Sequence, residues 1–413
     1  MLLLLFKESV AFAWHSLLSN KLRSFLSLLG ITIGIFAIIL VFTIVDGLES
    51  NIRGSLQSLG NNVVYIQKWP WSFGPEYPWW KYINRPVPQY YELDELSRKC
   101  RSTEALAYRI GARKTIKYRS SSISNAVVSG ISHDFYRIKN FDLAEGRYFT
   151  RNETDAGYSV VLIGSEIAAG LFPGEEPVGK DIRIAGRKAT VVGVLKKEGE
   201  SLLGISVDYQ VITPFNFARY FIDTKSENSD PTIYAKARPN VTNAEMMDEL
   251  TGLLRGIRKL KPRAEPDFAL NETSLLTQGF DALFAIIGTA GWIIGGFSIL
   301  VGGFGIANIM FVSVRERTNL IGIQKSLGAK NLFILSQFLA ESVFLSVIGG
   351  FFGLLITFII TTLGKDSMDI DISLTGGNIV LGFTISILIG IISGFIPAYS
   401  ASQLDPVEAI RST

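Results

Sequence analysis

One segment of the sequence has the spacing of a nucleotide-binding loop. Gly174, Gly179 and Lys180 match the two glycines and the lysine of the pattern G-x-x-x-x-G-K-[ST]. In that pattern backbone N–H groups cradle phosphate and a hydroxyl holds magnesium. Asp181 stands at the hydroxyl position, where its carboxylate would repel phosphate, and Pro177 removes one N–H donor. The following residues have the pattern of a strand, so no helix N-terminus would face a phosphate. We therefore interpret the segment as a turn.

Metal and nucleophile chemistry has little support in the composition. The chain has one cysteine, Cys100, and two histidines, His15 and His133, which are far apart in sequence. A single cysteine excludes an intrachain disulfide and a cysteine-based zinc site. We expect no metal site, no Ser–His–Asp triad, no cofactor bound by this chain and no enzymatic activity of its own.

Aromatic residues and prolines crowd residues 69–91. Four of the six tryptophans lie here, and they are Trp69, Trp71, Trp79 and Trp80. Prolines prevent a regular strand ladder, which predicts an extended loop. Such a loop suits contact with a partner or an apolar substrate, because Trp and Tyr dominate binding hot spots. It also suits a loop that packs its aromatic side chains onto its own domain, the interpretation that we favour.

Four stretches of the chain contain no Asp, Glu, Lys or Arg, and they are residues 24–45, 282–314, 342–364 and 372–404. As a helix, each can cross about 30 Å of hydrocarbon at about 1.5 Å per residue. The remainder has about 25% charged residues, as soluble proteins do. The pattern predicts an α-helical membrane protein with four transmembrane helices and a large α+β domain inserted between helices 1 and 2. It excludes a purely soluble enzyme, a disordered chain and an outer-membrane barrel.

The charges that flank these stretches predict the orientation. Lys7, Lys21 and Arg23 precede the first span, and the loop between spans two and three carries Arg315, Arg317, Lys325 and Lys330. The loop between spans three and four has Lys365 against Asp366, Asp369 and Asp371. Lys and Arg prefer short cytoplasmic flanks, so both termini are expected in the cytoplasm and the large domain outside. The net charge of +3 and the lack of a long basic run argue against a nucleic-acid partner.

The expected segments follow from these spans. They are 1–23, an amphipathic helix on the cytoplasmic face; 24–45, span one; 46–281, the periplasmic domain; 282–314, a stalk and span two; 315–330, a cytoplasmic loop; 331–363, span three; 364–378, a periplasmic loop; 379–404, span four; and 405–413, a cytoplasmic tail. Stretches 282–314 and 372–404 exceed the length that a bilayer requires, so part of each is expected to project, tilt or lie on the surface.

Local patterns predict elements of the inserted domain. Short runs rich in Val and Ile predict strands over 62–67, 159–163, 189–195 and 209–213. Thr242 and Glu245 have the spacing of a capping box, and apolar residues then repeat at helical spacing as far as Leu260. The helix is expected to be ended by Pro262. The domain is expected to form two subdomains, the smaller over about 120–215.

Every predicted span contains glycines four residues apart, which allow helix backbones to approach closely. The pairs are Gly30/Gly34, Gly291/Gly295, Gly349/Gly353 and Gly390/Gly394. They predict tight packing, either within one chain or across a dimer. Glu341 is the ionisable residue of the third span, and we interpret it as an unremarkable residue at the membrane interface, the alternative being a paired or protonated carboxyl within the lipid.

The loop 315–330 has the pattern of a short helix, with Leu320, Ile323 and Leu327 on one face and Gly328 as a stop. Its cations would anchor the membrane surface, or the helix would be the place where a cytoplasmic motor pushes. Composition leaves both open.

Several motifs resemble those of MacB/FtsX-type ABC transporter permeases over nearly the whole chain. They are residues 21–34 at the first span, 303–310, 314–318 and 321–329 around the loop, 337–342 with 349–350 in the third span, 397–398 with 405–411 at the end, and 171–194 in the periplasmic domain. One departure is Leu320, where the family usually has an acidic residue before Ile-Gly. The ion pair to the motor that an acidic residue would make at this point is therefore not carried over to this sequence.

The resemblance implies a permease that carries a separate cytoplasmic ABC ATPase, which binds the ATP and magnesium. It implies a homodimer, or a heterodimer with a paralogous permease, in contact with inner-membrane lipid, and for some members a periplasmic adaptor and an outer-membrane channel. The expected ATPase-coupling residues are Arg315, Glu316, Arg317, Gly322, Lys325 and Gly328. The implied function is export of antibiotics, peptides or lipoproteins. The alternatives are an FtsX-like activator of a periplasmic cell-wall hydrolase without transport, and a membrane-bound receptor or enzyme.

Overall fold

Two units make up the computed structural model, one of residues 1–50 with 282–413 and one of residues 51–281. The structure describes residues 21–57, 62–72, 77–199, 206–364 and 372–411. The predicted helix over 1–23 therefore lies almost wholly outside the described residues, and so do the charges at 365, 366, 369 and 371.

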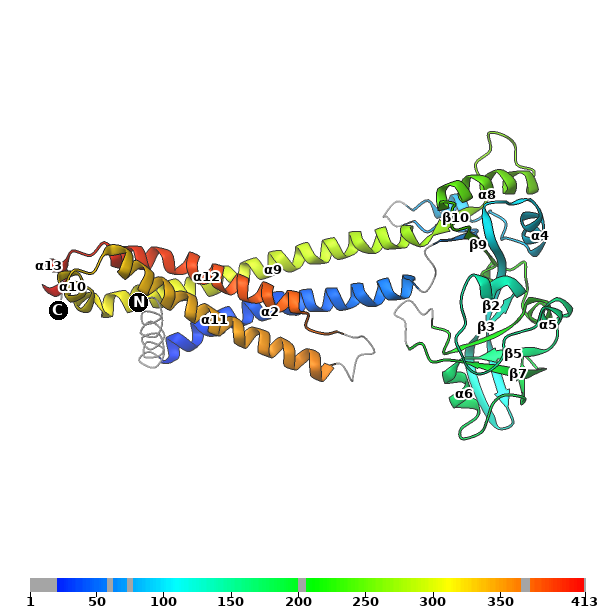
Figure 1. Cartoon of the computed structure of the whole chain (residues 1–413), viewed down its shortest axis with the longest axis horizontal. Coiled ribbons are helices and arrows are strands. Elements are labelled where there is room, and N and C mark those ends of the chain that lie inside the picture. Colours follow the sequence, from blue (N-terminus) through cyan, green and yellow to red (C-terminus); the bar gives the residue numbers. More distant parts are fainter. Residues whose placement is uncertain (1–20, 58–61, 73–76, 200–205, 365–371, 412–413) are drawn as a thin grey trace. The chain divides into compact units, whose positions relative to one another are not determined.

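Four long apolar helices dominate the helical unit (Figure 1). They are α2 (Lys21–Gln57), α9 (Thr273–Glu316), α11 (Asn331–Gly364) and α12 (Gly376–Ser402). Each is long and apolar enough to cross a membrane, and together with the mixed domain between the first and second they confirm the predicted fold class. With 44 residues, α9 is more than twice the length of about 20 residues that a bilayer requires.

The helices of this unit pack through small residues around an isoleucine-rich core. Ile31, Ile35, Ile38 and Ile39 of α2 are at most 1% exposed. This run extends over more than two turns of α2, because β-branched side chains, although weak helix formers, pack well once buried. Two further helices are short, α10 (Thr318–Ser326) and α13 (Pro406–Arg411).

One mixed sheet of ten strands forms the centre of the inserted domain, in the order β10-β1-β9-β2-β3-β8-β5-β7-β4, with β6 paired to β2 and β7. The strands are β1 (Val63–Gln67), β2 (Thr103–Tyr118), β3 (Ser121–Ile131), β4 (Leu143–Gly146), β5 (Val160–Ile163), β6 (Asp181–Ile184), β7 (Arg187–Leu195), β8 (Gln210–Pro214), β9 (Thr232–Ala237) and β10 (Ala269–Glu272). The four predicted strands are present as β1, β5, β7 and β8. The sheet continues across the subdomain boundary that was expected near residue 120, because β3 pairs with β2 on one side and with β8 on the other.

Helices lie between the strands in sequence, and several of them pack on the sheet. They are α3 (Trp79–Tyr82), α4 (Tyr90–Lys99), α5 (Arg151–Ala156), α6 (Ser165–Leu171), α7 (Phe215–Ala218) and α8 (Asn243–Ile257), with short 3-10 turns η1 (His133–Arg137) and η2 (Glu227–Ser229). The capping box of Thr242 and Glu245 is confirmed, since each side chain bonds the other's backbone N–H. The predicted end of α8 was too late: the helix stops at Ile257, and Lys259 adopts a left-handed φ of 52°.

Candidate functional site

A short helix interrupts the loop between the second and third long helices. Here α10 follows α9 after a break at Arg317. The Thr318 hydroxyl donates to the carbonyl of Val314 (3.1 Å), which ties the first turn of α10 to the end of α9. Beyond α10, Gly328 has a φ of 97°, a conformation that is easily adopted only by glycine. The loop is therefore a defined helix with a defined stop.

Lys325 faces inward, towards the end of another helix. Its ammonium donates to the carbonyls of Ser402 (2.9 Å) and Leu404 (2.7 Å), at the C-terminal end of α12. The last carbonyls of a helix have no N–H partner within it, and a cation there also complements the helix dipole. Lys325 thereby fastens α10 to α12.

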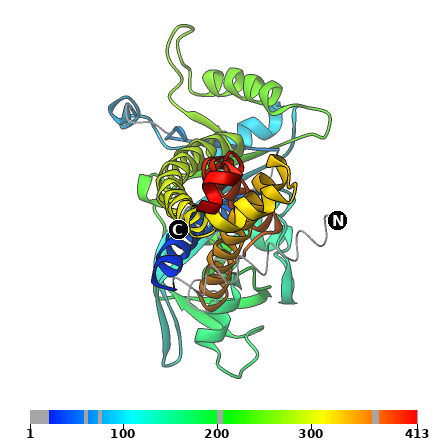
Figure 2. The same cartoon turned by 90° about the vertical axis from the view of Figure 1, so that its left-hand side faces the viewer.

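Gly322 faces the C-terminal helix. A methyl group at Gly322 would lie 2.9 Å from the Cβ of Ala409 and 3.0 Å from the Cγ1 of Ile410. The red α13 lies against α10 at the end of the bundle that faces the viewer in Figure 2. This close contact exists because residue 322 has no side chain.

The opposite face of α10 is apolar and exposed. Leu320 is 56% exposed, Ile323 43% and Leu327 85%. Arg315 and Glu316 are also exposed, at the end of α9. A solvent-facing row of large apolar side chains is unusual unless something covers it. The predicted coupling residues thus divide into an inward set, with Gly322 and Lys325, and an outward set.

Glu341 is enclosed by protein, and our interpretation of it as unremarkable is wrong. The residue is 2% exposed within α11. Arg317, which separates α9 from α10, forms an ion pair with it. A buried carboxylate is strongly destabilising unless it is paired, so this residue has a specific structural task.

All eight predicted packing glycines lie at contacts between helices of this one chain. An added methyl group would lie within 3.6 Å of another helix at each, namely at Gly30 (Gly302), Gly34 (Ser298), Gly291 (Val41), Gly295 (Ile38), Gly349 (Ile31), Gly353 (Phe36), Gly390 (Ser346) and Gly394 (Ser342). The tightest backbone approach is at Gly390, where the methyl group would lie 2.6 Å from the Cα of Val343, and at Gly353 it would lie 3.0 Å from the N of Phe36. These positions join α2 to α9, α2 to α11, and α11 to α12.

The four clustered tryptophans divide into two pairs. Trp69 donates its indole N–H to Glu227 (2.5 Å), and the ring of Trp71 lies 4.9 Å from that of Tyr65. In contrast Trp79 and Trp80, both in α3, are 54% and 58% exposed. The first pair packs onto its own domain, as one interpretation of the segment requires, and the second pair faces outward.

The segment that resembles a nucleotide-binding loop is a pair of turns. Gly174 and Gly179 have left-handed φ values of 75° and 83°, and Lys180 pairs with Glu175 of the same segment. It leads into the strand β6, as expected. Among the residues that the structure describes, no group of three or more His, Cys, Asp or Glu side chains is placed to hold a metal ion.

Sequence reasoning missed the part that α13 plays in this site. A usable signal was present, because Asp405-Pro406 has the pattern of an N-cap followed by proline at the first helical position. The Asp405 carboxylate indeed accepts the backbone N–H of Val407 (2.8 Å). That signal predicts a helix, but not the surface that the helix covers.

Comparisons with known proteins agree with this architecture. Residues 24–253 match the family model of the MacB-like periplasmic core domain, and residues 292–406 match that of the FtsX-like permease C-terminal domain. The chain is 30% identical to the pyoverdine export ATP-binding/permease protein PvdT of Pseudomonas aeruginosa, over 98% of this chain and 58% of that protein. It is 30% identical to the macrolide export ATP-binding/permease protein MacB of Agrobacterium fabrum, over 98% of this chain and 60% of that protein.

The chain therefore spans about three-fifths of the length of these curated relatives. Among solved structures, the periplasmic region of MacB from Actinobacillus actinomycetemcomitans is similar over 56% of this chain and 97% of that one, with a TM-score of 0.45 and 18% identity.

Proposed function

We propose a function from the premise that this chain belongs to the family of ABC transporter permeases with a MacB-like periplasmic core domain and an FtsX-like C-terminal domain. In this proposal the chain is the permease of an exporter in a bacterial inner membrane, with both termini in the cytoplasm. It converts ATP hydrolysis by a separate cytoplasmic ATPase into motion of its periplasmic domain.

The observation that carries the proposal is the attachment of α10. Lys325 holds it to α12, Gly322 seats it on α13, and Arg317 joins its start to α11. A partner that pushes on the exposed face would therefore move several helices together. The helix before it, α9, runs unbroken for 44 residues, or about 66 Å at 1.5 Å per residue, which suits a stiff transmitting element.

We propose Leu320, Ile323 and Leu327 as the surface that the ATPase covers. Large apolar side chains at the centre of an interface supply most of its binding energy, whereas rim charges chiefly affect the association rate. This fits the departure at residue 320, where an apolar side chain replaces the acidic one that the family usually has. Arg315 and Glu316 would lie at the rim.

The other partners are proposed on the basis of family membership. The permease would act as a homodimer or as a heterodimer with a paralogous permease, and an exporter that crosses both membranes would add a periplasmic adaptor and an outer-membrane channel. ATP and magnesium would bind to the ATPase. The relatives carry the names of pyoverdine export and macrolide export, and a macrolide is a convenient first substrate to test.

Co-purification with the cognate ATPase tests the proposed surface. Leu320→Asp and Leu327→Asp place a charge in the interface and should each reduce the recovered ATPase at least about tenfold, since a desolvated unpaired charge costs several kcal/mol. Tyr220→Asp is a matched control, because Tyr220 is 63% exposed in the periplasmic domain. Unchanged recovery with both leucine variants would reject the surface.

Export is tested separately. Cells that express the permease with its ATPase should tolerate more macrolide than cells that express the Leu327→Asp variant. Equal tolerance, with cell-wall hydrolysis instead reduced in the variant, would favour the hydrolase-activator alternative over export.

A further inference from the structure

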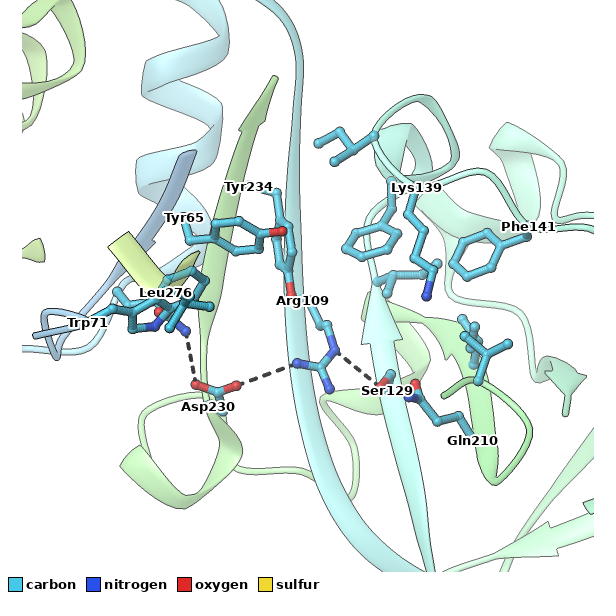
Figure 3. Close-up of a pocket in the computed structure, with 16 residues that line it drawn as sticks. Tyr65, Trp71, Arg109, Ser129, Lys139, Phe141, Gln210, Asp230, Tyr234 and Leu276 are labelled. Carbon is cyan, nitrogen blue, oxygen red and sulfur yellow. Dashed lines mark hydrogen bonds and ion pairs between the residues drawn. The ribbon is translucent and has the colours of Figure 1, made fainter. Parts of the chain in front are cut away.

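A cavity of about 290 Å³ opens on one face of the sheet in the periplasmic domain (Figure 3). Five neighbouring strands line it, and their residues include Tyr65 (β1), Tyr234 (β9), Arg109 (β2), Ser129 (β3) and Gln210 (β8). The segment after η1 adds Lys139 and Phe141 on the opposite side from Trp71. Cavities near this size with a few polar groups are typical of small-molecule sites.

Cations outnumber acids among the residues that line the cavity. Arg109 and Lys139 face a single carboxylate, Asp230. The ion pair of Arg109 with Asp230 is long, at 3.5 Å, and Asp230 is 65% exposed, so solvent screens it. The Nε of Arg109 also donates to Ser129 at 3.3 Å. These contacts are longer than the 2.7–2.9 Å that is usual for charge-assisted hydrogen bonds.

Lys139 is the less compensated of the two cations. Its side chain is 18% exposed, and the nearest described carboxylate, that of Glu198, lies 3.9 Å away, beyond hydrogen-bonding distance. Burial lowers the pKa of the Lys139 ammonium, Glu198 opposes this shift, and Arg109 adds to it. An anion placed between Lys139 and Arg109 would relieve their mutual repulsion and replace the water that burial removed.

The remaining wall is apolar and largely aromatic. The rings of Tyr65 and Tyr234 lie 5.0 Å apart, edge to face, and Trp71 packs on Tyr65 at 4.9 Å. Such rigid ring faces favour a flat apolar group and lose little conformational entropy on contact. Figure 3 shows Lys139 on the side away from Tyr65 and Trp71, with Arg109 between them beside Tyr234.

We propose that this cavity binds a small organic anion with a flat, apolar body. The anionic group would lie between Lys139 and Arg109, and the body would lie against the rings of Tyr65, Trp71 and Tyr234. The site belongs to the periplasmic domain alone, so it holds whatever the role of α10.

The experiment uses the full chain in phosphatidylcholine nanodiscs, with calorimetric titration of two probes that share one ring system. These are 1-naphthalenesulfonate, an anion, and 1-naphthalenemethanol, which is neutral, and empty nanodiscs supply the blank. We expect saturable binding of the sulfonate, at least about tenfold tighter than the alcohol, because a hydrogen bond to a charged group contributes about 1.5–3 kcal/mol.

Three variants locate the binding. Lys139→Met keeps the apolar stem and should weaken the sulfonate about tenfold or more while changing the alcohol little. Ile138→Trp places a large ring in the cavity and should abolish binding of both probes. Lys188→Met removes a cation that is 72% exposed and paired with Asp181 outside the cavity, and should change neither probe. Thermal unfolding of each variant checks that it is folded.

Other outcomes overturn the proposal. Absence of saturable sulfonate binding, equal affinity for the two probes, or sulfonate binding that a folded Lys139→Met or Ile138→Trp variant retains would each reject the site.

Discussion

The Nη1 of Arg317 lies 3.1 Å from the Oε2 of Glu341, and it links the start of α10 to a carboxylate buried in α11. The carboxylate is 2% exposed and the guanidinium 19%, so desolvation penalises the acid more than the base. The pair therefore does more than neutralise a charge. It also joins the break between α9 and α10, which lies at Arg317, to α11.

Loss of either partner of this pair should lower the free energy of unfolding, and the two losses should be unequal. Arg317→Met leaves a buried carboxylate and should lower the free energy of unfolding by roughly 3–5 kcal/mol. Glu341→Gln leaves a partly exposed cation and should lower it less, by roughly 1–3 kcal/mol. The double variant should be more stable than the sum of the two losses implies, as thermal unfolding in detergent would measure. Strictly additive losses would show that the two residues act independently.

A bulky residue at position 322 should separate α13 from α10. Gly322→Leu would place its side chain where Ala409 and Ile410 now lie, so we expect ATP hydrolysis that no longer drives export while the protein remains in the membrane. ATPase rate and macrolide tolerance measure the two quantities. Gly252→Leu is the matched control, because no atom lies within 4 Å of a methyl group there. Normal export by Gly322→Leu would exclude α10–α13 contact from the coupling.

The glycine positions can be tested for their role within one chain. Gly353→Ala adds a methyl group 3.0 Å from the backbone of α2 and should lower the free energy of unfolding by roughly 1–3 kcal/mol. Gly296→Ala, where nothing lies within 4 Å, should be neutral or slightly stabilising because alanine favours helix. Chemical unfolding at low protein concentration measures both. If Gly353→Ala loses stability only at concentrations where the protein dimerises, the contact across a dimer is the important one.

Acid should weaken the periplasmic domain through Glu153. Arg147 donates two hydrogen bonds to this carboxylate (2.8 and 2.7 Å) and lowers its pKa to about 2, below an ordinary 4.5. Because the pKa is lowered on folding, the stabilisation is complete above pH 4.5 and is lost as the pH falls towards 2. Glu153→Gln should therefore melt well below the wild type at pH 7, and the two melting temperatures should converge with acidification. Exposed Glu176→Gln serves as control, and a constant gap across this pH range would contradict the argument.

The membrane orientation predicts which positions are labelled from outside. In a Cys100→Ser background, a membrane-impermeant maleimide should label Tyr220→Cys in cells whose outer membrane is permeabilised and whose inner membrane is intact. It should label Leu327→Cys only when the inner membrane has also been permeabilised. Labelling of Leu327→Cys without that step would reverse the topology.

Much of the architecture follows from local patterns. The absence of charge over 24–45 and the three similar stretches determined four long helices, because an unpaired charge is expensive in hydrocarbon whatever the tertiary contacts. The capping box of Thr242 and Glu245 determined the start of α8 for a similarly local reason. The long hairpin of β2 and β3 was not predicted, because its polar outer positions interrupt the runs of Val and Ile by which strands are recognised.

The candidate sites depended on contacts between residues that are distant in sequence. Position alone suggested that Lys325 faces a cytoplasmic partner, whereas the structure directs it to Ser402, 77 residues later. The cavity takes residues from five strands, and strand order is set by pairing rather than by sequence order. The sequence by itself determined which segments leave water and where helices begin, since burial and capping act over a few residues. Only the tertiary structure decided which face of each helix is free and which charges meet, because those depend on the packing of segments that the chain brings together from far apart.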